Sequence, residues 1–279
     1  MVTSTTSAQS LIAEQVSSML VQPLESASVI LGSGAQVINS SNPVRIPTIG
    51  NHAPLGWVGE NELIPEGDST FGEISLMPTD RKSIKTIVRV SNELIRSATV
   101  GVSAALQSRM VNDVRELLDT ELLTGDGSDD GVTGLTNQPG IGTGAYDPED
   151  MDSILDGLAA MAADEITPTH LIVNPADYFT MRKVKDGDGR PLLQPDLTAG
   201  VQYRLHGVAV VATNKLPAGQ AVLADMPSVV VVRDIDPDVT ILNERYAEYD
   251  QVGIRVRTRY DLGLTRPEGV TLLTAATGA

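Results

Sequence analysis

Residues 90–131 read VSNELIRSATVGVSAALQSRMVNDVRELLDTELLTGDGSDDG and contain the longest helical pattern of the chain. Apolar side chains recur at gaps of three and four from Leu106 onward, Leu117 among them. This spacing predicts one helix with a broad buried face and an opposite polar face that includes Asp119. A helix over 103–123 would be roughly 30 Å long at ~1.5 Å per residue. The rest of the chain is therefore expected to be arranged around this helix.

The loop that ends this stretch, GDGSDDG, has two interpretations. Gly125 is a natural C-cap for the helix. Asp126, Ser128 and Asp130 also match the opening of a calcium loop, in which oxygen ligands recur at alternate positions. Such a loop needs a bidentate Glu at its twelfth position, where this chain has Asn137, and no amphipathic helix follows. The sequence therefore favours helix termination over calcium binding.

The composition disfavours several classes of protein. A net charge of −16 opposes nonspecific attraction to nucleic-acid phosphates, and an aromatic content of 3% argues against a surface that stacks bases. The absence of cysteine removes disulfides, thiolate zinc sites and thiol nucleophiles. No apolar run reaches the length of a membrane span, and the N-terminus lacks the features of a signal peptide.

The N-terminal part is expected to reach outward from the helix. Residues 8–21 have the spacing of a short amphipathic helix, and residues 32–54 are rich in Gly, Ser, Asn and Pro, which is typical of an extended segment. Residues 57–91 follow with the alternation of strands. Between Trp57 and Phe71 the sequence predicts a long hairpin tip that carries four acidic residues, Glu60, Glu62, Glu66 and Asp68.

The part after the long helix alternates between helices and strands. Asn174 is a good N-cap for a helix that begins at Pro175. The alternation between residues 150 and 245 predicts an α/β subdomain inserted between two β-rich pieces. Its expected elements are helices at 150–161 and 175–184, a loop at 185–200, and strands at 170–173, 207–212, 220–225, 228–233 and 238–242.

The last long strand carries a stripe of positive charge. Apolar residues and Thr258 alternate with Arg255, Arg257 and Arg259, so the arginines share one strand face, and a strand at 269–274 closes the chain. One interpretation is a solvated strand face. The other pairs the arginines with the acidic hairpin tip of a neighbouring subunit, because arginine makes bidentate bonds to carboxylates.

No set of residues suited to catalysis is apparent. His52, His170 and His206 are too dispersed to form a metal or nucleophile-activating cluster. Asp186 and Asp188 lie in an Asp-Gly-Asp-Gly stretch that is more typical of a turn than of an acid–base pair. We therefore expect neither enzymatic activity nor a cofactor.

Six stretches, taken together and in order, resemble the major capsid proteins of tailed bacteriophages, which have the Hong Kong 97 fold. The resemblance runs from about residue 10 to about residue 275. The stretches are WVGENELIPEGDSTFGEISLMP, RKSIKTIVRVSNELI, ALQSRMVNDVRELLDTELLTGDGSDDGVTGL, HLIVNPADYFTMRKVKDGDGRPLL, LHGVAVVAT and VGIRVRTRYDLGLTRPEGVTLL.

The resemblance implies an α+β fold with five regions in this chain. They are an N-terminal arm at 1–50, an E-loop at 51–80, a peripheral domain at 81–147 with a spine helix at 103–123, an axial domain at 148–245, and return strands of the peripheral domain at 246–279. By the same analogy Trp57 and Phe71 are candidate apolar anchors between subunits, since buried aromatic residues dominate interface energetics. Asp186, Asp188 and Arg190 lie in a loop that would meet other subunits around the capsomer axis.

The implied function is self-assembly into pentamers and hexamers of an icosahedral phage head, which forms in the host cytoplasm and encloses double-stranded DNA. The DNA would be held without sequence-specific contacts, and no membrane is involved. Other expected partners are scaffolding and portal proteins, with decoration proteins left open. Two alternatives are an encapsulin-like nanocompartment shell and a calcium-dependent enzyme that uses GDGSDDG and the 185–200 loop.

Two departures from the family pattern carry their own expectations. Met1 is followed directly by the arm, so a separate scaffolding protein, or none, is expected in place of a fused scaffolding extension. Some members of the family cross-link a lysine of the E-loop to a neighbouring subunit. The first lysine here is Lys82, beyond the hairpin tip, so a non-covalent shell is expected.

Overall fold

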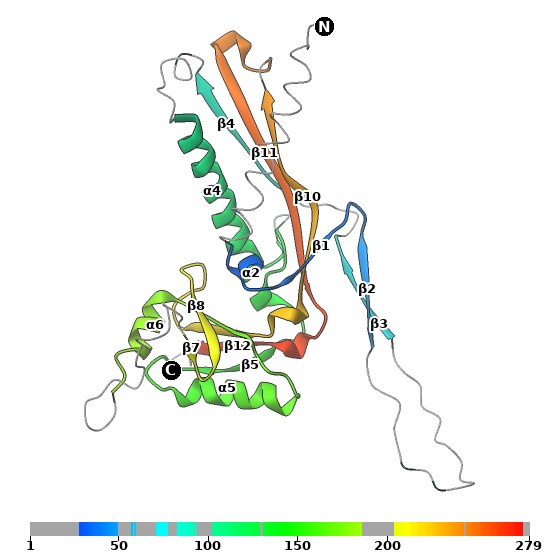
Figure 1. The fold of residues 1–279 in the computed structure, drawn as a ribbon, viewed down its shortest axis with the longest axis vertical. Coiled ribbons are helices and arrows are strands. Elements are labelled where there is room, and N and C mark those ends of the chain that lie inside the picture. Colours follow the sequence, from blue (N-terminus) through cyan, green and yellow to red (C-terminus); the bar gives the residue numbers. More distant parts are fainter. Residues whose placement is uncertain are drawn as a thin grey trace, which may run out of the picture.

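The long helix forms as expected and lies beside a long, twisted sheet (Figure 1). The computed structural model describes residues 28–49, 57, 59, 71–77, 83–91, 93, 102–128, 131–185, 204–242 and 244–275. In it α4 spans Val102–Thr124, close to the predicted 103–123. Val114, Leu118 and Leu122 of the predicted apolar face are buried.

Two residues of α4 depart from the predicted pattern. Leu117 is 47% exposed, although its spacing placed it on the apolar face, and Asp119 is 3% exposed, although it was expected on the polar face. Asp119 is buried because it contacts residues that lie far away in the sequence. The Ser28 hydroxyl and the Val29 N–H, at the start of the short helix α2 (Val29–Gly32), both donate to Asp119. A buried carboxylate is acceptable where it receives such hydrogen bonds.

Among the described residues, the long sheet has the strand order β1-β10-β11-β4. β10 and β11 are antiparallel, β4 is antiparallel to β11, and β1 is parallel to β10. α4 packs on one face, where Val114 and Leu118 join a core with Val256 and Tyr260. The bounds are β1 Gln36–Asn39, β10 Val229–Leu242, β11 Gln251–Leu264 and β4 Ile84–Ser91.

β10 differs from the prediction of two strands at 228–233 and 238–242. It is one long strand whose pairing with β11 shifts register between Arg233 and Ile235 and again between Ile235 and Asp238. Pro237 lies in the shifted stretch, and proline is tolerated where a ladder is interrupted in this way. The residues that looked like a break in the sequence are therefore an irregularity within one strand.

A second sheet lies below the long one in Figure 1, and its strand order among the described residues is β5-β12-β9-β6-β8-β7. Helices α5 (Asp152–Ala163) and α6 (Pro175–Met181) share a core with one of its faces. Asn174 caps α6 as predicted, because its Oδ1 accepts a hydrogen bond from Ala176 N at 2.9 Å. The strands are β5 Gly142–Tyr146, β12 Val270–Ala275, β9 Gln220–Ala224, β6 His170–Val173, β8 Val208–Ala212 and β7 Arg204–Leu205.

The two sheets do not follow the expected division at residues 148–245. β5 and β12, which flank that range, belong to the six-stranded sheet, whereas β10, inside the range, belongs to the long sheet. Parallel pairing of β12 with β5 joins residues that are far apart in the sequence. Local periodicity predicts the strands but contains no information on such pairing.

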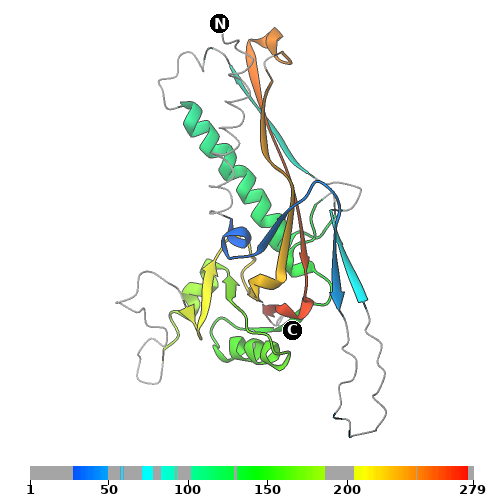
Figure 2. The same cartoon turned by 45° about the vertical axis from the view of Figure 1, so that its right-hand side comes forward.

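Strands β2 (Val44–Ile49) and β3 (Phe71–Leu76) pair in an antiparallel ladder that extends away from both sheets (Figures 1 and 2). Short 3-10 turns complete the described elements, at Leu135–Asn137, Met226–Ser228, Ala247–Tyr249 and Pro267–Gly269. Among the described helices, none is both long enough and apolar enough to pass through a membrane.

Candidate inter-subunit surfaces

The arginine stripe predicted from the sequence forms on β11. Val256, Thr258 and Tyr260 are at most 5% exposed and face α4, whereas Arg255, Arg257 and Arg259 alternate with them and are only partly buried. β4 adds positive charge to the same face, because Lys85 pairs in register with Arg257 and Arg89 with Gly253. We call this surface the basic face; its residues are Lys85, Arg89, Arg255, Arg257 and Arg259.

Sequence reasoning missed Lys85 and Arg89. Both are exposed and both lie in IKTIVRVS, where they alternate with residues that face the core. The alternation alone could have placed them on one strand face. What it could not supply is the pairing of β4 with β11, which adds their charge to that of the arginines.

Part of the basic face is already engaged within the chain. Arg259 Nη1 lies 2.8 Å from Asp234 Oδ2, and these side chains are 19% and 4% exposed. Arg255 Nη2 donates to Thr240 Oγ1 at 3.3 Å. The pair of Arg259 with Asp234 is therefore partly buried, and its charge is balanced inside the subunit.

An arginine–tyrosine cluster ends the basic face at the tip of the long sheet. The guanidinium of Arg89 lies 5.0 Å from the centre of the Tyr246 ring, and that of Arg245 lies 5.8 Å from it. Gly253 makes room for the ring, because a Cβ atom there would lie 2.7 Å from Tyr246 Cε2. Cations stack favourably on aromatic faces, so this cluster fixes the direction of Arg89.

The other half of the same sheet face is apolar and is covered by the base of the β2–β3 hairpin. Leu76 and Met77 bury against Val230 and Val232. Gly263 lets the hairpin approach, because a Cβ atom there would lie 2.6 Å from Leu76 Cδ2. We call this surface the covered half.

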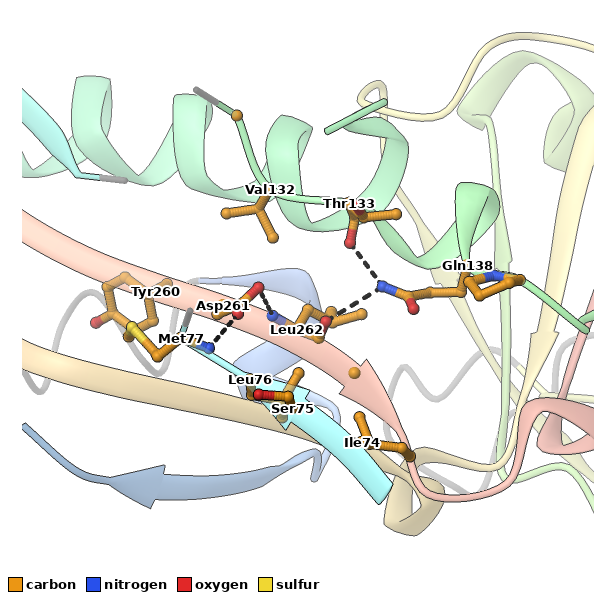
Figure 3. Close-up of a pocket in the computed structure, with 13 residues that line it drawn as sticks. Ile74, Ser75, Leu76, Met77, Val132, Thr133, Gln138, Tyr260, Asp261 and Leu262 are labelled. Atoms are coloured by element: carbon orange, nitrogen blue, oxygen red, sulfur yellow. Dashed lines mark hydrogen bonds between the residues drawn. The ribbon is translucent and has the colours of Figure 1, made fainter. Parts of the chain in front are cut away.

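A polar contact anchors the end of β3 at the border between the two halves. Asp261 Oδ2 accepts a hydrogen bond from Met77 N at 2.6 Å, and Asp261 Oδ1 accepts one from Leu262 N at 2.9 Å (Figure 3). Met77 has a φ of 58°, in the left-handed region that a residue with a side chain rarely adopts. The hydrogen bond to Asp261 stabilises this turn, which leads the chain out of the hairpin.

A cavity of about 300 Å³ lies beside this anchor, between the hairpin base, β11 and the loop after α4 (Figure 3). Gln138 lines the cavity and links the loop after α4 to β11, since its Nε2 donates to Thr133 O at 2.8 Å and to Leu262 O at 3.2 Å. Asp261 and Gln138 therefore both bind backbone groups. The cavity is the place where three segments are joined.

The loop after α4 caps the helix, as the sequence favoured. Asn137 Nδ2 donates to Thr124 O at 3.1 Å and to Gly125 O at 3.0 Å, so the residue at the twelfth position of the supposed calcium loop binds carbonyls at the helix end. Asp126 Oδ1 accepts from Ser128 N at 2.9 Å. Gly125 is needed for close approach, because a Cβ atom there would lie 2.2 Å from Val132 O. In the described part of the chain, no three acidic or histidine side chains are grouped to hold a metal ion.

The N-terminal segment is fastened to α4 through Asp119. Its Oδ1 accepts from Ser28 Oγ at 2.6 Å and from Val29 N at 3.0 Å. Burial raises the pKa of the Asp119 carboxyl, although these hydrogen bonds and the positive charges of Arg115 and Lys215 act in the opposite direction. Sequence reasoning missed this residue because its partners lie about ninety positions away.

Most of the other predicted contact residues lie outside the described residues, so their roles stay predictions. Trp57 is described and fully exposed. Phe71 begins β3, but its side chain is not described. The residues outside are Glu60, Glu62, Glu66, Asp68, Asp186, Asp188 and Arg190.

Comparison with known proteins identifies the family of this chain. The family model described as the Phage capsid family matches residues 8–275. The chain belongs to the phage capsid family. This membership confirms the expectation that the chain is a structural protein of a virion and not an enzyme.

Two curated relatives agree with the family. The major capsid protein of Klebsiella oxytoca phage phiKO2 is 22% identical over 293 residues, which cover 94% of this chain and 67% of the relative. The major capsid protein of Enterobacteria phage HK97 is 25% identical over 285 residues, which cover 93% of this chain and 70% of the relative. The chain therefore spans about two thirds of the length of each relative.

Solved structures agree on the fold. The capsid of an empty GTA particle matches with a TM-score of 0.72 at 19% identity, over 88% of this chain and 90% of that chain. The structure titled Mycobacterium phage Cain matches with a TM-score of 0.72 at 18% identity, over 90% and 91%. At these identities the likeness shows the fold, which is the α+β fold of phage and GTA capsids.

Proposed function

We propose that this chain is the major capsid protein of a tailed-phage head, and that its copies assemble as pentamers and hexamers into an icosahedral shell around double-stranded DNA. The observation that carries this proposal is the match of the capsid family along residues 8–275, which covers both sheets, the long helix and the hairpin. The hairpin extends away from its own subunit, as an element that contacts a neighbour would.

The regions of the subunit follow from the same proposal. Residues 1–50 are the N-terminal arm, whose described end is held on the spine helix α4 by Asp119. Residues 51–80 are the E-loop, of which β3 is the returning strand. The long sheet with α4 forms the peripheral domain, and the six-stranded sheet with α5 and α6 forms most of the axial domain. The loop at 185–200, with Asp186, Asp188 and Arg190, meets other copies around the capsomer axis.

The basic face is the proposed seat for the acidic hairpin tip of an adjacent subunit. Four carboxylates lie between Trp57 and Phe71, in a chain whose net charge is −16. Lys85 and Arg89 are exposed, and Arg257 is partly exposed on the same face. Opposite charges on the two segments favour this pairing and disfavour contact between like segments.

The enclosed DNA is held without sequence-specific contacts. The net charge of −16 disfavours tight adsorption of DNA to the inner wall, which suits DNA that must be packed and later released. The proposed partners besides other copies are portal and scaffolding proteins, and no contact with a membrane is involved.

Electron microscopy of particles purified from cells that express the full chain tests this proposal. Closed shells of uniform diameter are expected, with nuclease-resistant DNA in complete heads. A dispersed monomer in every preparation would contradict the proposal, and shells that hold a protein cargo without nucleic acid would favour a nanocompartment.

Boiled shells should give only monomer on a denaturing gel, since the expected shell is non-covalent, and a ladder of multimers would contradict that.

A further inference from the structure

The six-stranded sheet has an acidic end. β5 lies at one edge among the described strands, and α5 packs beside it on the sheet. Residues 141–169, which contain β5 and α5, include no lysine or arginine. They contain seven acidic residues, Asp147, Glu149, Asp150, Asp152, Asp156, Asp164 and Glu165.

Among the described residues, the edge strand β7 and the segment that follows α6 are basic. α6 follows β6, and β7 lies at the other edge among the described strands. This end carries Arg182, Lys183, Lys185 and Arg204, and all but the partly buried Arg182 are exposed. The acidic residue of α6, Asp177, is 7% exposed and accepts a hydrogen bond from Gly219 N at 2.8 Å, so it faces inward.

Each charged end also exposes a large apolar side chain on a helix. Leu155 of α5 is 41% exposed and lies one turn from Asp152 and next to Asp156. Phe179 of α6 is 57% exposed, with Lys183 four positions later and Arg182 three positions later. Residues three and four apart lie on the same side of a helix. On α5, Leu155 therefore lies beside acidic residues, whereas Phe179 lies in the last turn of α6, just before the basic segment that follows the helix.

We propose that the acidic face of α5 in one copy packs against Phe179 and the basic segment that follows α6 in the next copy around a ring. Leu155 and Phe179 both stay exposed in one copy, so the two surfaces do not cover each other within a subunit. A head-to-tail contact joins acid to base and Leu155 to Phe179, whereas a symmetric contact would oppose two acidic or two basic faces. Head-to-tail contacts close into rings, which ties this inference to the proposed assembly.

Charge reversal tests the pairing. Asp152→Lys combined with Asp156→Lys should lower the yield of closed particles by about tenfold, because like charges then face each other around the whole ring. Lys183→Glu combined with Lys185→Glu should have a similar effect, and the combination of all four substitutions should restore assembly. Failure of the combination to restore particles would overturn the pairing.

A control separates pairing from net charge. Arg45 and Arg109 are highly exposed and lie on the hairpin and on α4, away from both faces. Adding Arg45→Glu and Arg109→Glu to the α5 double variant returns the net charge to −16, as in the unchanged chain. This combination should not restore assembly. Restoration would show that net charge governs the yield, and the pairing would be wrong. The segment 186–203 stays unchanged in every variant.

Cross-linking tests the direction of the contact, since the chain has no cysteine of its own. Particles that carry both Leu155→Cys and Phe179→Cys, treated with a short bismaleimide, should give a ladder on a denaturing gel that ends at pentamers and hexamers. Particles with either single substitution should give only monomer. Dimers from a single substitution would mean a symmetric contact, and monomer from the double variant would mean no contact; either result overturns the inference. If the unchanged chain forms no particles, the proposed function itself fails.

Discussion

The covered half and the basic face lie on the same side of the long sheet and differ in what packs on them. The covered half pairs Val230 and Val232 with Leu76 and Met77 of the chain's own hairpin. The basic face lies on the part of β11 that precedes Asp261, and the described residues do not cover it with apolar side chains in this way. The difference separates two uses of one sheet, because the first half stabilises the subunit and the second is the proposed contact surface for a neighbour.

The largest expected effect belongs to the covered half. Leu76→Ala removes a side chain that is 4% exposed and leaves a cavity under the hairpin. It should lower the free energy of unfolding by about 3 kcal/mol, as measured by urea denaturation of unassembled subunits. Ile87→Ala is the matched control, because Ile87 is 41% exposed on β4, between Lys85 and Arg89. Its effect should stay below about 0.5 kcal/mol, and equal effects would remove the distinction between the halves.

The border between the halves is the subject of the second prediction. Arg259→Gln removes the ion pair between Arg259 and Asp234, whose side chain is 4% exposed. The free energy of unfolding should fall by about 2 kcal/mol, somewhat less than for a fully buried pair, because Arg259 is 19% exposed. Arg259 would thus act in folding although it lies on the basic face. A fully stable variant that fails to assemble would instead assign Arg259 to the contact with a neighbour.

The sequence predicted what local spacing controls. The helix α4, the Asn174 cap and the alternation on β11 all follow from residues within a few positions of one another. It failed where the partner lies far away. The register of β4 on β11 brought Lys85 and Arg89 to the arginines, and the pairing of β12 with β5 crossed the expected domain limits. Neither is visible in a single segment.

The position of Asp119 illustrates the same limit and gives the third prediction. Burial raises its pKa above the ordinary value of 3.8, so between these two pKa values the folded subunit binds more protons than the unfolded chain. Its contribution to stability is therefore greatest below 3.8 and declines as the pH rises through the folded pKa. Asp119→Asn should remove this decline while its carbonyl still accepts from Ser28 and Val29. Unfolding measured from pH 3 upward checks it, and parallel stability curves for the two proteins would contradict it.

Arg257→Glu should have the smallest effect on the subunit and a large one on the shell. Arg257 lies on the basic face between Arg255 and Arg259. Its side chain is therefore on the side of the sheet away from α4 and is not part of the apolar core. Because the side chain is partly exposed, the fall in unfolding free energy should stay at or below about 1 kcal/mol, although Asp238 pairs in register with this position. Assembly should nevertheless fail, since the new carboxylate would oppose the acidic hairpin tip of the neighbour. Sedimentation of the assembled fraction, alongside urea denaturation of the free subunit, measures both quantities in one protein. Normal particle yield would mean that the basic face is a solvated surface. Lost particles from a stable subunit would show that the basic face contacts the next copy.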